Sequence, residues 1–203
     1  MPRLYQHGRG MFPSVTEILR VLEKPYYDRW RHRVGRKEAD RVMQEAQVFG
    51  TRLHAAARAV ATGADAVEPE MKPYAAAVEE FLERHVGEVL GAEVDLVSPE
   101  YRFGGTLDLY CQLKDGAYAV IDWKTTSSLS REHGLQTAAY ALLVREQGWR
   151  INRRIVVRVK KEKPGAYYAR TYREHAEDLE AFLACRTVWW WMHKRRLDKH
   201  ASR

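Results

Sequence analysis

The chain has 203 residues, of which 45% are hydrophobic and 30% charged, and its formal net charge is +7 at pH 7. This length can bury one substantial core but is short for two, so we expect a single domain over residues 1–203. The excess of positive charge favours an anionic partner, of which nucleic acid is the commonest. No stretch approaches the roughly 20 apolar residues that a membrane span requires, which argues against a membrane protein.

The cysteines and the first residues indicate the compartment. Cys111 and Cys185 lie far apart without a Cys-x-x-Cys pair, which argues against a zinc site or an iron-sulfur cluster held by thiolates. The amino-terminal residues lack the apolar run of a signal peptide. We therefore expect a cytoplasmic protein in a reducing environment, in a bacterium or a phage-infected cell.

The first part of the chain, about residues 13–88, is predicted to be helical. Residues 14–17 fit a capping box that opens a short helix, and Pro25 is expected to end it. Good helix formers over 37–61 predict a long helix, and a further helix is expected over about 73–85.

The middle of the chain, from about residue 92 to 172, is predicted to form a sheet. Residues 93–97 and 105–113 alternate or cluster β-branched and apolar side chains, as strands do. A turn at 114–116 and a mostly apolar strand at 117–122 follow, so the last two strands should form a hairpin.

The remaining elements complete a mixed α/β domain. We expect a helix over residues 133–147, strands near 155–159 and 167–172, and a final helix from about 174 to 197. The fold class is therefore α/β, with a mixed central sheet flanked by helices.

Two carboxylates and a lysine form the most informative pattern. Asp108 lies inside one hairpin strand, and Asp122 and Lys124 lie two residues apart on its partner, so these two project from the same face. Two acidic groups in a buried sheet repel each other and need a cation. Magnesium suits them, because it prefers oxygen ligands and is held by only one or two carboxylates. The lysine would neutralise charge on a substrate phosphate. A structural ion network is the alternative, since such short patterns recur by chance.

His54 is a candidate metal ligand on the predicted long helix. It shares one helical stripe with small and apolar residues, namely Met43, Ala46, Gly50, Ala57 and Ala61. That stripe should pack inward, and a histidine on such a face is commonly a satisfied core residue. Gly50, one turn earlier, favours the functional interpretation because it lets a ligand or another backbone approach.

With these residues in place, the sequence resembles the PD-(D/E)XK nuclease superfamily, in particular its RecB-type branch, which includes phage and mitochondrial genome maintenance exonucleases. Five segments carry the likeness in the expected order. They are 13–16 (Pro-Ser-Val-Thr), 50–54 (Gly-Thr-Arg-Leu-His), 105–108 (Gly-Thr-Leu-Asp), 122–125 (Asp-Trp-Lys-Thr) and 136–140 (Gln-Thr-Ala-Ala-Tyr). The last two segments are the specific part.

The resemblance implies a restriction-endonuclease-like fold and a metal site. It implies that His54, Asp108 and Asp122 ligate one or two Mg²⁺ or Mn²⁺ ions, with help from the backbone carbonyl of Trp123. It also implies that Lys124 serves the attacking water. Some relatives carry a four-cysteine iron-sulfur cluster, which this chain lacks the residues to hold.

Gln136 and Tyr140 lie four residues apart, so they share a helix face near the strand ends, where α/β sites usually open. A half-buried amphipathic pair is the alternative. The resemblance implies instead that they, together with Thr125, contact DNA near the scissile phosphate, and Tyr140 could also stack on a base. Glu100 and Arg102 could reach the site or a phosphate, although a solvated strand edge is the better expectation.

A second nucleic-acid contact is suggested by residues 24–37, where aromatic and basic side chains are interleaved. Single strands favour this mixture, since bases stack while phosphates pair with cations. Tyr26, Tyr27 and Trp30 are the candidate stacking residues. A loop whose aromatics cap the core is the alternative.

The predicted final helix carries three consecutive tryptophans, 189–191, and a basic tail over 194–199. Consecutive side chains point in different directions about a helix, so one core face cannot bury all three rings. We expect the core to take most of them, and the tail to contact phosphate without specificity.

Together these features predict a metal-dependent deoxyribonuclease. The resemblance to RecB-type enzymes favours an exonuclease acting on single-stranded DNA or DNA ends, in recombination, repair or replication. One alternative is a structure-specific endonuclease that cuts flaps or branches. Another is a nucleic-acid-binding module that keeps the fold without turnover, which a missing carboxylate or lysine would favour, and none is missing.

Overall fold

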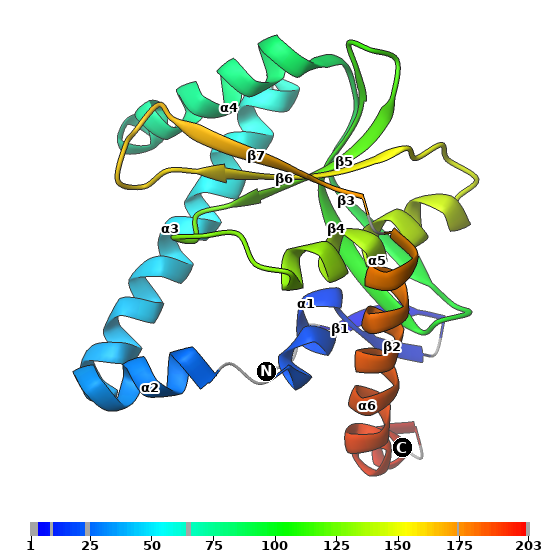
Figure 1. Ribbon diagram of the computed structural model, residues 1–203. Helices are drawn as coiled ribbons and strands as arrows, with labels where there is room; N and C mark the ends of the chain where they lie inside the picture. Colours follow the sequence, from blue (N-terminus) through cyan, green and yellow to red (C-terminus); the bar gives the residue numbers. More distant parts are fainter. Residues whose placement is uncertain (1–3, 9, 23–24, 64–65, 174, 202–203) are drawn as a thin grey trace.

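The computed structural model describes residues 4–8, 10–22, 25–63, 66–173 and 175–201, with side chains described up to residue 193. Figure 1 shows the arrangement of its elements. In chain order they are β1 (Leu4–His7), β2 (Gly10–Pro13), α1 (Val15–Ile18), the 3-10 turn η1 (Leu19–Val21), α2 (Pro25–Val34), α3 (Arg36–Thr62), the 3-10 turn η2 (Pro69–Met71), α4 (Lys72–His85), β3 (Val86–Ser98), β4 (Phe103–Leu113), β5 (Tyr118–Lys124), α5 (Glu132–Glu146), β6 (Arg153–Val159), β7 (Tyr167–Tyr172) and α6 (His175–Ala201).

A five-stranded mixed sheet, in the order β3-β4-β5-β6-β7, forms the centre of the molecule. β3, β4 and β5 form an antiparallel meander, β5 and β6 are parallel, and β7 is antiparallel to β6. α5 connects the two parallel strands, which a short turn could not do. The predicted α/β class is confirmed, and so is the predicted hairpin, in which Leu109 pairs with Ile121.

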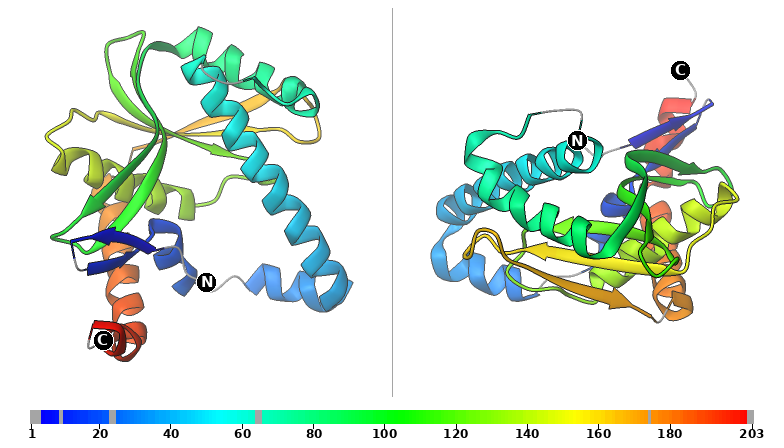
Figure 2. Two further views of the ribbon diagram at one scale, coloured as in Figure 1. Left: turned by 180° about the vertical axis from the view of Figure 1, so that it is seen from behind. Right: turned by 90° about the horizontal axis from the view of Figure 1, so that it is seen from above.

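The sheet separates two hydrophobic cores, and helices cover both of its faces (Figure 2). On one face, α3 and α4 pack through Leu53 and Phe81 against strand residues such as Trp123. On the other, α1, α5 and α6 pack through residues that include Leu143 and Phe182. Fully burying one such side chain stabilises the fold by roughly 1.5–3 kcal/mol. The β4–β5 hairpin is therefore fixed from both sides.

α2 and the first half of α3 form an arm, defined as residues 25–49, that extends away from the sheet (Figure 1). Ala39 is the only buried residue of the arm. The prediction that the stripe through Met43 and Ala46 packs inward is therefore wrong for this half, although Ala57 farther along is buried. The reason is length, because a helix of 27 residues extends beyond the sheet that it crosses.

Pro25 begins a helix rather than ending one. It is the first residue of α2, where its missing N–H is not needed for an intrahelical bond. Residues 25–34 are therefore helical and not a loop, while residue 24 lies outside the described residues. The capping box at the preceding helix is present in part. Ser14 Oγ accepts from the backbone N–H of Glu17 at 3.0 Å.

The first strand of the central sheet begins earlier than the pattern indicated. β3 starts at Val86 and not near residue 92, because β-bulges between Val86 and Glu88 and between Val89 and Gly91 break its alternation. The β1–β2 hairpin was not predicted at all. It lies against β4, where the Tyr5 hydroxyl is 2.8 Å from the Thr106 hydroxyl.

The carboxyl-terminal helix fits the prediction where the structure describes it. α6 is described from His175, whereas residue 174 and the side chains of the basic tail at 194–199 lie outside the described residues. Trp189 is buried and Trp190 is half-buried against the same core, while Trp191 is 80% exposed. Among the described helices, none combines the length and apolar character needed to cross a membrane.

Two glycine substitutions should change the stability in opposite directions. A Cβ at Gly105 would lie 2.7 Å from Cε1 of the buried Tyr140, so Gly105→Ala should lower the free energy of unfolding by about 1–3 kcal/mol. A Cβ at Gly50 would meet the Thr125 hydroxyl at an ordinary 3.7 Å. Gly50→Ala should therefore raise the free energy of unfolding by up to about 1 kcal/mol, since alanine is the better helix former. Urea denaturation measures both changes, and shifts of the same sign would contradict this packing.

Candidate metal centre

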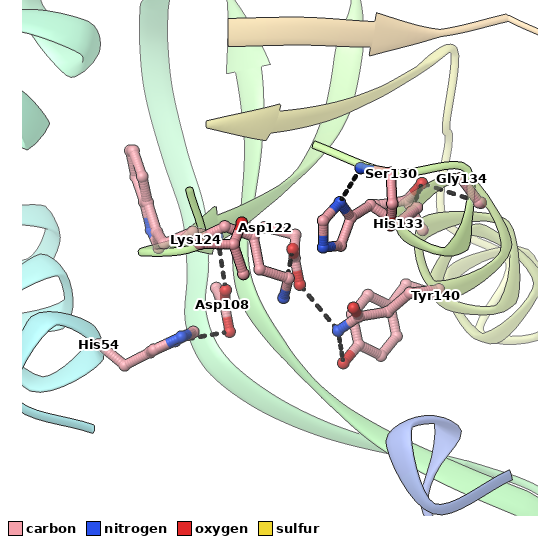
Figure 3. Close-up of polar contacts among 12 residues, drawn as sticks. His54, Asp108, Asp122, Lys124, Ser130, His133, Gly134 and Tyr140 are labelled. Atoms are coloured by element: carbon pink, nitrogen blue, oxygen red, sulfur yellow. Dashed lines mark hydrogen bonds and ion pairs between the residues drawn. The ribbon is translucent and has the colours of Figure 1, made fainter. Parts of the chain in front are cut away.

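Asp108, Asp122 and Lys124 come together on the β4–β5 hairpin (Figure 3). Because Leu109 pairs with Ile121, Asp108 and Asp122 occupy the next opposed position on the two strands. Opposed residues of an antiparallel pair point to the same face. Lys124 extends to that face as well, and its Nζ lies 2.6 Å from Oδ2 of Asp122. The hairpin thus places the three charged groups on one face, with Lys124 and Asp122 in direct contact.

Asp108 is held by the neighbouring strand and by α3. Its Oδ2 accepts a hydrogen bond from the backbone N–H of Trp123 at 2.7 Å, and its Oδ1 lies 3.1 Å from Nδ1 of His54. The Trp123 ring itself packs in the core against Phe81, with 5.5 Å between ring centroids. The side chain of His54 remains 33% exposed, so it is not a fully enclosed core histidine.

Asp122 is the most deeply buried of the charged groups, with 1% exposure. Its Oδ1 accepts from Nε2 of Gln136 at 2.9 Å, and the same amide group lies 3.0 Å from the Tyr140 hydroxyl. Its Oδ2 is in the ion pair with Lys124 but accepts no well-directed hydrogen bond from the described residues. This buried carboxylate oxygen can therefore still coordinate a cation.

Glu93 joins the site although no sequence motif indicated it. Its position in β3 is opposite Asp108, because Ala92 pairs with Leu109 and Val94 with Leu107. Oε1 of Glu93 lies 3.9 Å from Nδ1 of His54. The backbone at Glu93 has φ of 52°, which is uncommon for a residue other than glycine. The bulges in the register of β3 also mark this region as an irregular strand. The residue pattern does not show them, so it could not identify Glu93 as part of the site.

One cavity of about 580 Å³ collects these side chains between α3, the hairpin and α5. Each of the five segments that carry the sequence likeness contributes to its wall. The contributions include Thr16, Gly50, Asp108, Asp122 and Gln136. Residues far apart in the chain therefore converge on a single opening, as a binding or catalytic site requires.

The electrostatics of the cavity show unbalanced negative charge. The pKa of Asp122 is raised to about 6, mainly because the carboxyl group is buried. The ammonium of Lys124 lowers this pKa, whereas the carboxylate of Asp108 raises it further. Burial lowers the pKa of His54, but the carboxylate of Asp108 outweighs this effect and leaves the pKa raised. Both shifts follow from carboxylates that are poorly solvated.

The donor set fits a divalent cation. One ligand atom each from His54, Glu93 and Asp108 lies within 4.8 Å of the others, and the buried Oδ2 of Asp122 is in contact with Lys124 but accepts no well-directed hydrogen bond from the described residues. A set with one imidazole nitrogen and several carboxylate oxygens suits Mg²⁺ or Mn²⁺. Whether the backbone carbonyl of Trp123 takes part stays a prediction.

Gln136 and Tyr140 are buried parts of the site rather than a half-exposed pair, with 6% and 5% exposure. The Tyr140 ring packs against Gly105, so its hydroxyl and not a ring face is the group near Asp122. This packing argues against base stacking by Tyr140. Thr125 follows β5 and lies beside Gly50 of α3.

The structure does not bring the aromatics of α2 to this cavity. Tyr26 is 65% exposed on the arm, and the rings of Tyr27 and Trp30 pack on each other with centroids 5.5 Å apart. Glu100 and Arg102 are also elsewhere, in the exposed turn between β3 and β4. The expectation of a solvated edge for these last two residues agrees with their position.

Comparisons with known proteins agree on fold and family. Residues 14–200 match the model of the PD-(D/E)XK nuclease superfamily. The crystal structure of SSO0001 superposes with a TM-score of 0.50 over 93% of this chain and 78% of that one, at 14% sequence identity, which supports the restriction-endonuclease-like fold. An alkaline exonuclease from Laribacter hongkongensis gives a TM-score of 0.37 at 17% identity, over 68% of this chain and 79% of that one. No curated protein sequence matches.

Removal of one carboxylate tests the donor set directly. Glu93→Gln should weaken Mn²⁺ binding by about tenfold, which corresponds to about 1.4 kcal/mol, because a neutral amide replaces a charged ligand. Isothermal titration calorimetry measures the affinity, and the metal-induced rise in unfolding temperature provides a second readout.

The matched control for this change is Glu88→Gln, an exposed glutamate on the same strand that pairs with Gln112. It should bind Mn²⁺ as the unmodified chain does. Equal affinities for the Glu93 variant and the unmodified chain would exclude Glu93 from the ligands.

Proposed function

The chain belongs to the PD-(D/E)XK nuclease superfamily, and we propose that it is a metal-dependent deoxyribonuclease that hydrolyses DNA phosphodiester bonds, most simply as an exonuclease on single strands or DNA ends. The observation that carries the proposal is the convergence of Asp108, Asp122, Lys124 and His54 on one cavity. Superfamily membership implies a nucleic-acid substrate. The restriction to DNA and to ends rests on the resemblance of the five segments to RecB-type enzymes.

Each side chain has a role that its contacts support. His54, Asp108, Asp122 and Glu93 would hold one or two Mg²⁺ or Mn²⁺ ions, which supply Lewis-acid stabilisation of the phosphate and lower the pKa of water. Lys124, with its Nζ 2.6 Å from Asp122, orients the attacking water and offsets charge that develops on the phosphate oxygens. The ion pair with Asp122 limits the freedom of the lysine and so fixes its ammonium at the reacting centre.

Gln136 and Tyr140 are positioned to complete the cavity wall. The Gln136 amide binds both Asp122 and the Tyr140 hydroxyl, which orients that carboxylate through the oxygen that Lys124 does not contact. We assign substrate contact to the exposed parts of Gln136, Tyr140 and Thr125 near the scissile phosphate. Removing the Gln136 amide should therefore weaken both metal binding and substrate binding.

The arm offers a second contact for a single strand. Tyr26 is 65% exposed there, and basic residues alternate with the aromatics of α2. Some of the charge is neutralised within the arm, as by Arg31 with Asp40 at 3.1 Å. Stacking on Tyr26, and on exposed edges of Tyr27 and Trp30, would hold bases while the cavity holds a phosphate.

Cleavage of end-labelled DNA tests the catalytic assignment. We expect nucleotide release from single-stranded or duplex DNA with Mg²⁺ or Mn²⁺, none with chelator, and none from Asp122→Ala. Lys124→Ala should lower the rate by about 10²–10⁴-fold while metal and DNA binding persist, because it removes a group that acts on the reacting atoms.

The control for the lysine is Lys163→Ala, an exposed lysine in the turn between β6 and β7, which should cleave normally. If Lys124→Ala cleaves DNA at the rate of the unmodified chain, the role proposed for Lys124 is wrong. DNA binding without cleavage in any metal would favour the non-catalytic module. Cleavage of covalently closed circles or branches, with linear ends left intact, would favour the structure-specific endonuclease.

Stacking on the arm has its own test. Tyr26→Ala should weaken the binding of a single-stranded oligonucleotide in chelator by about 1–3 kcal/mol, the usual contribution of one base on an aromatic ring. Fluorescence anisotropy measures the affinity, with Trp191→Ala as a control that removes another exposed aromatic ring. An unchanged dissociation constant for the Tyr26 variant would show that the arm does not bind the strand through this ring.

A further inference from the structure

A second cavity, of about 530 Å³, lies where the end of α5 and the beginning of α6 meet the edge of β6 and β7. It shares no lining residue with the catalytic cavity. Its wall is rich in basic residue types, namely Arg145, Arg153, Arg154, Arg173 and His175. Among the described residues that line it, none is a carboxylate. We refer to it as the arginine cavity.

Two of these arginines are anchored by acidic partners. Arg154 is 3% exposed, and its guanidinium donates to the carbonyl of Gly134 at 2.8 Å and to Oδ2 of Asp178 at 2.9 Å. Arg153 lies 2.5 Å from Oδ2 of Asp115. These pairs build the wall of the cavity, and their charge is largely neutralised.

The other two arginines have no acidic partner among the described residues. Arg145 and Arg173 are exposed, and within the described part of the chain neither has a carboxylate oxygen within 4.0 Å. Both side chains line the cavity, and no carboxylate of the described residues pairs with either of them. Arginine presents a planar fork of donors that matches the oxygens of a phosphate group.

His175 adds a hydrogen-bond donor to the same wall. Its Nε2 is in contact with the Arg145 guanidinium, and its Nδ1 is buried without a hydrogen-bond partner among the described atoms. Burial, followed by the charges of Arg145 and Arg154, lowers the pKa of His175 to about 4. The neutral ring accepts from Arg145 at Nε2 and so carries its proton on Nδ1, which leaves an unsatisfied N–H donor.

The strand register connects this cavity with the catalytic centre. Lys124 pairs with Arg158 of β6, so both point to the same face of the sheet. Arg154 lies an even number of residues before Arg158 on β6 and therefore points to that face as well. Arg170 of β7 pairs with Val156 between them. Arg154 is paired with Asp178 and Arg158 with Glu162, so Arg170 is the exposed basic residue on this face of the two strands.

We propose that the arginine cavity binds a phosphate group, with Arg145 and Arg173 as its charged contacts and His175 as a further donor. The phosphate belongs either to a nucleic-acid strand that continues past the catalytic centre or to a free nucleotide. The exposed Arg170 of β7, on the sheet face that also carries Lys124, favours the strand. Phosphate binding here requires no hydrolysis, so the proposal is tested apart from the nuclease activity.

The test compares the unmodified chain with the double variant Arg145→Gln, Arg173→Gln in chelator, so that no cleavage occurs. Inorganic phosphate and thymidine monophosphate are titrated by calorimetry, and a single-stranded oligonucleotide is titrated by anisotropy over a range of salt concentrations. The control is Arg20→Gln, Arg84→Gln, which removes two exposed arginines that pair with Glu17 and Glu80 outside the cavity. Because all four arginine side chains are exposed, these changes should leave the fold intact, which circular dichroism checks.

Two results would support the proposal and identify the source of the phosphate. If the cavity holds a strand, the double variant should bind the oligonucleotide at least about tenfold more weakly, and the slope of log K against log salt should fall by about 0.7 for each phosphate that is no longer neutralised. If the ligand is a free nucleotide, binding of phosphate and thymidine monophosphate should fall by a similar factor while the oligonucleotide is unaffected. Equal binding of every probe by the double variant, the control and the unmodified chain would overturn it.

Discussion

The structure depends on two carboxylates that face each other from neighbouring strands inside a folded sheet. Asp108 and Asp122 repel each other and have lost much of their water, so each oxygen must meet a donor or a cation. The protein supplies a backbone N–H, a lysine ammonium, a glutamine amide and an imidazole, and one oxygen of Asp122 remains without a directed donor. That remaining capacity is what makes the centre suited to a metal ion.

The fold brings these partners from opposite sides. α3 packs on one core and presents His54, whereas α5 packs on the other core and presents Gln136. The hairpin lies between them and is fixed by both cores, so its charged residues cannot separate to reach solvent. Burial that would otherwise destabilise the carboxylates therefore also holds the geometry of the candidate metal centre in place, as functional centres often require.

Basic side chains are concentrated in two separate regions of the molecule. The arm carries basic and aromatic side chains at one end, and β6, β7 and the arginine cavity carry arginines in a separate region. This arrangement is a more specific indication than the net charge of +7, which describes the chain without saying where the charge lies.

Local pattern determined a large part of this picture. Alternation and apolar runs predicted the hairpin, period two placed Asp122 and Lys124 on one face, and a four-residue spacing joined Gln136 to Tyr140, because these relations involve only near neighbours along the chain. The motif segments likewise indicated the superfamily. Glu93 could not be found this way, since it reaches the site through an irregular strand with positive φ and through the register of β3 on β4.

The sequence by itself determined the residue types and charges available to the candidate site and the class of fold, because residue type and short spacing fix these properties. Only the tertiary structure decided that Pro25 starts the arm, that half of α3 leaves the core, and that arginines from α5, from β6 and from the segment after β7 share a second cavity. These outcomes depend on how far a helix extends past the sheet and on which strand edges meet. Such relations between distant segments are set by packing and have no period in the sequence.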